Sequence, residues 1–181
     1  MLFADMTKRF VFLGCIFLAG LYAQSQTATQ EYLLKSINLY KICKFTSWPQ
    51  QAVPADTFVI KMIGEPRSGE NISIPADRRI LDLPVTVKVV NSMDQIYPCH
   101  VLFICESEKQ HLKEIISYAL KNSILTIGDT ENFAEQGVIV NFFIEDEVVK
   151  FKINVVSLNE SKLKLHSRLL SLAELVNKRT Y

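Results

Sequence analysis

Apolar residues recur at helical spacing in the segment between Glu31 and Phe45. Leu33, Ile37 and Tyr40 repeat every three to four positions, which predicts a helix that buries these three side chains. The helix is expected to end before Trp48–Pro49, because a residue that precedes proline disfavours the helical region.

Further apolar side chains lie outside this predicted buried face. The helix is therefore either covered on two sides or offers an apolar stripe to a partner. We expect this partner contact to be formed by Leu34, Ile42, Phe45 and Trp48. Trp48 has an alternative role that is more common for such a residue, which is to fill the end of its own core.

The middle of the chain predicts a strand, a helix and a second strand. A nearly all-apolar run from Cys99 to Cys105 is typical of a strand covered on both faces, and residues 123–127 form the second strand. Residues 107–110 match a capping box, and an apolar stripe follows at Leu112, Ile115, Ile116, Ala119 and Leu120. Such a unit favours parallel strands with a right-handed crossover. Two more strands are predicted upstream, at residues 57–63 and 85–90.

Alternating segments at residues 138–144 and 148–155, separated by an acidic turn, predict a β-hairpin in the C-terminal half. A helix is predicted from Ser167 to Val176. Together these elements predict a single mixed α/β domain that resembles a three-layer fold. We expect its mixed sheet to have about five to six strands and to be flanked by helices.

Residues 1–23 are typical of a secretory signal peptide. Two basic residues precede an apolar run at residues 10–22, and Ala23 provides a small residue for cleavage. The run is too short to cross a membrane, which needs about 20 apolar residues. A lipoprotein signal that ends at Cys15 is the less favoured alternative. We therefore expect a periplasmic mature domain at residues 24–181.

The composition excludes two broad classes of protein. Of 181 residues, 49% are hydrophobic, and 20 basic and 19 acidic side chains leave a net charge of +1. This apolar fraction argues against intrinsic disorder. The near-neutral charge, without a basic run, argues against nucleic-acid binding. Recognition of a partner would then depend on shape and apolar contact.

The motifs of common catalytic sites are absent from the sequence. It has no Gly-x-Ser-x-Gly elbow, no phosphate-binding glycine loop and no dinucleotide fingerprint, and its three histidines are scattered. We expect no catalytic residues, no cofactor and no metal. One place where a small ligand could bind is the carboxyl edge of the sheet, near Gly64 and Asp129. The favoured alternative for Asp129 is an N-cap on a short helix.

Export would place Cys43, Cys99 and Cys105 in an oxidising compartment, where disulfides persist. Cys99 and Cys105 bracket one strand, so about 20 Å separates their α-carbons and they cannot pair with each other. Any bridge would therefore include Cys43. The favoured alternative is that all three are small buried apolar side chains.

Five sequence strings, in order along residues 29–177, resemble the signature segments of the YfiR (HmsC-like) family of periplasmic proteins. The strings are Lys44–Pro49, Cys99–Ile104, Leu125–Asp129, Val149–Asn154 and Ser167–Ala173. Cys99 matches a cysteine position of the family, whereas Cys43 and Cys105 do not, and the segment 66–83 has no matching string.

This resemblance implies an exported α/β domain without enzymatic activity. In the characterised branch, such a protein binds the periplasmic part of a membrane-bound diguanylate cyclase and restrains it. Cyclic di-GMP and biofilm formation are thereby lowered. The alternatives that stay open are a sensor module that binds a small ligand and, as a further partner, a second copy of the chain.

Overall fold

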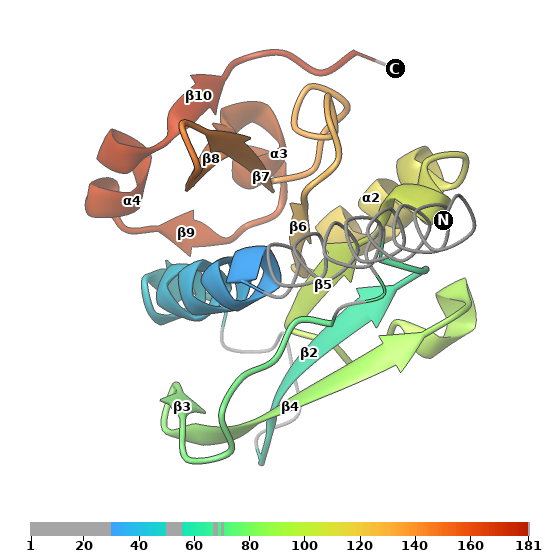
Figure 1. Cartoon of the computed structure of the whole chain (residues 1–181). Helices are drawn as coiled ribbons and strands as arrows, with labels where there is room; N and C mark the ends of the chain where they lie inside the picture. Colours follow the sequence, from blue (N-terminus) through green and yellow to red (C-terminus); the bar gives the residue numbers. More distant parts are fainter. Residues whose placement is uncertain (1–29, 50–55, 67–68, 70, 181) are drawn as a thin grey trace, which may run out of the picture.

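A mixed, twisted sheet forms the centre of the protein. The computed structural model describes residues 30–49, 56–66, 69 and 71–180, so the predicted signal segment and Cys15 lie outside the described residues (Figure 1). Within the described residues the sheet has eight strands, in the order β10-β8-β7-β6-β5-β2-β4-β3. The strands are β2 (Phe58–Ile63), β3 (Arg79–Ile80), β4 (Leu83–Val90), β5 (Val101–Ile104), β6 (Leu125–Gly128), β7 (Val140–Glu145), β8 (Val148–Asn154) and β10 (Glu174–Val176).

Five neighbouring strands, from β4 through β2, β5 and β6 to β7, are parallel. The β7–β8 pair is the predicted antiparallel hairpin, and the parallel pair β5–β6 confirms the predicted strand–helix–strand unit. The chain runs from β2 outward to β4 and then returns across β2 to β5. Strand order therefore reverses between β2 and β5, and such a switch point is where open α/β sheets commonly bind ligands.

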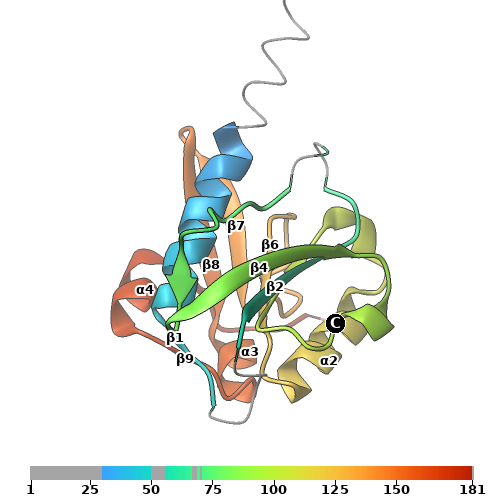
Figure 2. The same ribbon diagram turned by 90° about the horizontal axis from the view of Figure 1, so that it is seen from below.

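Helices cover both faces of the sheet. A helix at residues 30–44 lies on one face, and α2 (Leu112–Lys121) and α3 (Val155–Glu160) lie on the other (Figures 1 and 2). All five apolar residues of the predicted stripe in α2 are buried. The side chains of β5 are buried, which confirms the prediction of a strand covered on both faces, and those of β6 are buried as well.

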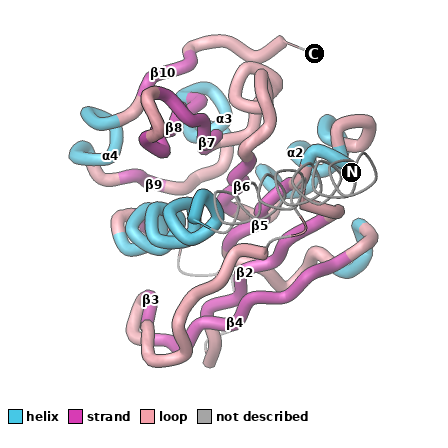
Figure 3. Tube along the Cα trace, in the orientation of Figure 1, coloured by secondary structure: helices cyan, strands magenta, loops and turns pink. Residues whose placement is uncertain are grey.

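Short elements complete the fold around this centre (Figure 3). A separate two-stranded sheet joins β1 (Thr46–Ser47) to β9 (Lys164–Leu165), so the end of the first helix is fastened to the C-terminal part of the chain. The remaining elements are the 3₁₀ helices η1 (Met93–Gln95) and η2 (Glu106–Glu108), and α4 (Ser167–Leu172).

Mixed α/β architecture is confirmed, but three local predictions are wrong. The helix predicted for residues 167–176 ends at Leu172, because the chain then pairs with β8 as strand β10. The predicted capping box does not form, because Ser107 lies in η2 and its Oγ accepts a hydrogen bond from the Glu65 amide instead. The end of the predicted second hairpin arm becomes α3, whose first turn is capped by the side chain of Asn154.

Candidate functional site

The helix at residues 30–44 is rotated relative to its predicted orientation. Leu33 is 58% exposed and Ile37 is 41% exposed, although the spacing predicted both to be buried. The side that faces the protein carries Tyr32, Lys35, Ser36, Leu39, Ile42 and Cys43. Two polar residues lie on this buried side because each has partners there.

Ser36 and Lys35 show how the polar groups are satisfied. Ser36 Oγ donates a hydrogen bond to the Tyr32 carbonyl and accepts one from the Ser73 amide. Lys35 pairs with Glu31 on the same helix and with Asp129 at the end of β6. The buried side is therefore selected by tertiary hydrogen bonds as well as by apolar contact.

The opposite side of this helix presents apolar side chains to solvent. We define the outer face as Leu33, Leu34, Ile37 and Phe45, which are exposed large hydrophobic residues. Leu34 and Phe45, two of the predicted contact residues, lie eleven positions and therefore about 16 Å apart on the same side of the helix. Ile42 is only 1% exposed, so it is unavailable for contact in the folded protein.

Two grooves border the outer face. One, of about 390 Å³, lies between Leu33, Ile37 and Tyr40 of the helix and the segment 73–78. The other, of about 330 Å³, lies beside Leu34 and includes Ile144 and Val149 of the β7–β8 hairpin. Apolar surface therefore extends from the helix to elements on both of its flanks.

Trp48 lies at the other end of this helix and fills the protein's own interior. Its indole Nε1 donates a hydrogen bond to the His100 carbonyl at 3.2 Å, and its ring meets the Phe58 ring edge to face, with centroids 5.2 Å apart. The imidazole of His100 stacks on Phe58 at 4.3 Å, and its Nδ1 accepts a hydrogen bond from the Val59 amide. Burial lowers the pKa of His100 to about 4, so its imidazole is neutral at pH 7.

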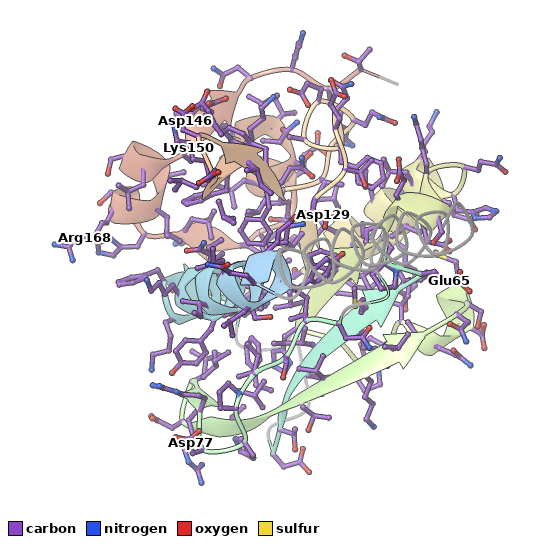
Figure 4. All side chains as sticks on the ribbon, viewed as in Figure 1. Glu65, Asp77, Asp129, Asp146, Lys150 and Arg168 are labelled. Atoms are coloured by element: carbon purple, nitrogen blue, oxygen red, sulfur yellow. The ribbon has the colours of Figure 1, made fainter. Side chains whose placement is uncertain are left out.

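Asp129 points toward the helix at residues 30–44 from the carboxyl end of β6 (Figure 4). Its Oδ2 lies 2.6 Å from Lys35 Nζ and accepts a hydrogen bond from the Tyr32 hydroxyl at 3.3 Å. Burial, together with the charge of Asp129, raises the pKa of Tyr32 above its ordinary value, which keeps that hydroxyl a donor. The segment after Asp129 forms turns instead of the expected short helix, so Asp129 serves as an ion-pair partner and not as an N-cap.

Gly64 lies at the switch point between β2 and β5 with a φ of +86°. A Cβ atom at this position would lie 2.3 Å from Ser107 Oγ and 2.8 Å from Glu108 Cγ. The protein's own side chains therefore occupy the space beside Gly64. The two predicted ligand-edge residues share the carboxyl edge of the sheet, but each is engaged by neighbouring residues of the chain.

Cys43, Cys99 and Cys105 are free and buried. Burial raises the pKa of Cys99 to about 12. It also raises the pKa of Cys105 to about 12, with added contributions from Asp129 and Glu108. These thiols are protonated at neutral pH and poorly nucleophilic. In the part of the chain that the structure describes, no group of three or more His, Cys, Asp and Glu side chains is placed to hold a metal ion.

Sequence reasoning missed Lys35, the residue that joins the helix to Asp129. A signal was present, because residues 32, 35, 39 and 42 share one side of the helix, and Thr46 continues this spacing into β1.

Within the described residues, no helix is both long and apolar enough to span a membrane.

These features define a small mixed α/β domain that exposes one apolar face of a helix. Its central polar side chains pair with other residues of the same chain. The sequence model of the YfiR/HmsC-like family matches residues 32–174, so the chain belongs to this family. Members of the family are periplasmic regulators. No curated protein matches the chain.

A solved structure, the ABC domain from Streptococcus pneumonia in complex with L-Trp, has a TM-score of 0.46 and 10% identity to this chain. The match covers 66% of this chain and 56% of that domain, so the chain spans little more than half the length of that structure.

Proposed function

We propose that the protein is an exported, non-enzymatic regulator that binds the extracytoplasmic part of a membrane signalling protein and restrains it. The partner is of the diguanylate cyclase type, so binding lowers cyclic di-GMP and biofilm formation. The observation that carries this proposal is the solvent-exposed outer face of the helix at residues 30–44 in a member of a family of periplasmic regulators.

The arrangement of the outer face supports a protein contact. Leu33, Leu34 and Ile37 are neighbours near the start of the helix, and the exposed side chains of Ile144 and Val148 lie at the tip of the nearby hairpin. Clustered apolar side chains on a surface mark sites of protein contact. The near-neutral charge of the chain fits recognition by shape and apolar contact instead of long-range attraction.

A substitution on the outer face tests this proposal. We expect Leu33→Glu combined with Ile37→Glu to abolish co-purification of the partner from membranes, because two charges would have to be buried in the contact. Leu175→Glu is the matched control, because Leu175 is 50% exposed on β10, away from this helix. A folded double variant that still retains the partner would exclude this surface.

The effect on signalling provides a second measurement. We expect cells that lack the protein, or that carry the double variant, to have more cyclic di-GMP and more biofilm than cells with the wild-type protein. Unchanged cyclic di-GMP in the deletion strain would contradict restraint of a cyclase, even if a membrane partner were found.

A small-ligand sensor is the alternative function. Its expected site near Gly64 and Asp129 is occupied by Ser107, Glu108 and Lys35, so binding there would require these side chains to move. A thermal-shift screen of metabolites tests this alternative, since a ligand that binds only the folded state raises the melting temperature. A ligand whose effect disappears in an Asp129→Asn variant would favour it over the first proposal.

A further inference from the structure

The larger groove beside the outer face carries positive charge on both of its walls. Lys41 lies on the helix wall and Arg78 on the wall formed by the segment 73–78, while Tyr40 and Ile74 contribute to the apolar lining. Lys41 and Arg78 are both exposed. Within the described residues, neither of them pairs with a carboxylate. This groove is therefore apolar inside and positively charged along both edges.

Contacts within the chain hold Arg78 at its edge of the groove. Its guanidinium lies 5.8 Å from the centroid of the Tyr40 ring, and its amide donates a hydrogen bond to the Pro75 carbonyl at 3.0 Å. The Tyr40 hydroxyl donates to the Arg79 carbonyl, which fastens this segment to the helix. A guanidinium beside an aromatic ring keeps its planar fork of N–H groups, and this fork matches a carboxylate. An acidic side chain is thus the complementary group for this edge.

The opposite flank of the helix has the reverse charge. The smaller groove is lined by Glu31 and by Glu147, which lies at the turn of the β7–β8 hairpin next to Asp146 (Figure 4). In the part of the chain that the structure describes, Asp146 and Glu147 pair with no basic residue. Lys150, also on the hairpin, is already paired with Glu145. A basic side chain is the complementary group on this flank.

We propose that the partner presents an amphipathic helix to this surface, with acidic side chains along the edge that meets Arg78 and basic side chains along the edge that meets the hairpin turn. This inference rests on the proposed function and specifies the chemistry of the partner. Leu33 and Ile37 are four positions apart and form a ridge beside the larger groove, a surface into which the side chains of a second helix can pack. Opposite charges on the two flanks fix which way round the partner binds. They are also compatible with the near-neutral net charge of the chain.

Zero-length cross-linking tests the charge pattern directly. A carbodiimide joins an amine to a carboxylate only when the two groups are close enough to react without a spacer. In the complex that the mature chain forms with its membrane partner, we expect mass spectrometry to find Lys41 joined to an aspartate or glutamate of the partner. Lys109 is the internal control, because it is exposed and precedes α2 on the other face of the sheet. A complex in which Lys109 is joined to the partner and Lys41 is not would overturn the proposal.

Charge reversal provides an independent measurement, which is the concentration of solubilised partner that half-saturates the immobilised protein. We expect Lys41→Glu with Arg78→Glu to raise this concentration about tenfold, because like charges would then face each other. The difference should shrink in about 1 M salt, where the Debye length is about 3 Å. Lys109→Glu with Lys121→Glu changes the net charge equally on the other face of the sheet and should bind as the wild type does.

Reversal of the hairpin flank, Asp146→Lys with Glu147→Lys, is expected to weaken binding to a similar extent. Wild-type affinity in either reversal would overturn the proposed charge pattern. The variant Leu33→Glu with Ile37→Glu separates this result from failure of the proposed function. If that variant loses the partner while both reversals retain it, the surface binds the partner but the charges do not select it. If that variant retains the partner, the outer face is not the contact and both proposals are wrong.

Discussion

Lys35 Nζ lies 2.6 Å from Asp129 Oδ2, and this ion pair joins the helix at residues 30–44 to the carboxyl end of β6. The Lys35 side chain is 5% exposed and that of Asp129 is 13% exposed. Because Lys35 must face the sheet to reach this carboxylate, the pair sets the rotation of the helix. The apolar outer face is a consequence of that rotation.

Asp129→Ala is expected to destabilise the protein by about 2–3 kcal/mol. Removing one partner of a buried ion pair leaves the other charge buried without compensation, which typically costs about 3–5 kcal/mol. Glu31 remains as a partner for Lys35 and reduces this cost. Urea unfolding followed by the fluorescence of Trp48, the one tryptophan of the chain, measures the difference.

Glu145→Ala is the matched control for this experiment. Glu145 pairs with Lys150 on the hairpin, where their side chains are 52% and 45% exposed. An exposed pair contributes about 0–1 kcal/mol, so we expect a far smaller loss of stability. Equal losses in the two variants would contradict a special role for Lys35 and Asp129.

Stability should fall as the pH drops from about 6.5 to about 4, because His100 is neutral in the folded state. Burial lowers its pKa to about 4 in the folded protein, so in this range the unfolded state binds more protons. The stability from this group is therefore present above pH 6.5 and is lost as the pH falls. A shift of this size corresponds to at most about 3 kcal/mol.

His100→Asn isolates this contribution. The amide oxygen of asparagine can accept the hydrogen bond that the Val59 amide donates to His100 Nδ1. We expect the variant to be less stable at pH 7, since it lacks the stacking on Phe58, but to lose less stability between pH 6.5 and pH 4. Parallel curves for the two proteins would show that His100 does not cause the dependence.

The three cysteines of the expected mature chain should not react in the folded protein. Cys43, Cys99 and Cys105 are buried, and burial raises the pKa of each thiol. Only the thiolate reacts with Ellman's reagent. We expect negligible labelling at pH 8 without denaturant and labelling of all three in guanidinium chloride.

Ser171→Cys provides an internal reference for this measurement, because residue 171 is exposed on α4. The introduced thiol should be labelled at once, while the three native thiols stay protected. Rapid labelling of a native cysteine without denaturant would contradict the burial described above.

Long apolar runs could be predicted from the sequence, because their burial depends little on distant residues. The strands around Phe103 and Ile127 and the stripe of α2 belong to this class. Strands of two or three residues, such as β9 and β10, could not be predicted, since they are held by partners far along the chain.

The candidate site was only partly predictable, for a related reason. Leu34 and Phe45 are exposed as a contact surface requires, but Leu33 and Ile37 were assigned to the core and Ile42 to the surface. Apolar spacing treats Lys35 and Ser36 as solvent-facing residues. Their burial depends on Asp129 and Ser73, which are distant in sequence.

Gly64→Ala is expected to destabilise the protein more than the same change at Gly69. Both glycines have positive φ angles, +86° and +71°, so alanine is strained at either position and costs about 1 kcal/mol. Only at Gly64 would the new Cβ also collide with Ser107 and Glu108, whereas nothing lies within 4 Å at Gly69. We expect about 2 kcal/mol of additional loss in urea unfolding, which is typical of overpacking.

Ser107→Gly should recover part of this additional loss when it is combined with Gly64→Ala, because it removes the nearest atom, Ser107 Oγ. The recovery is expected to be incomplete, since Glu108 still lies close and the Glu65 amide loses its acceptor. Equal stabilities of Gly64→Ala and Gly69→Ala would mean that the edge between β2 and β5 has room for a methyl group. In that case the edge would be more open to a small ligand than the packing of Ser107 against Gly64 indicates.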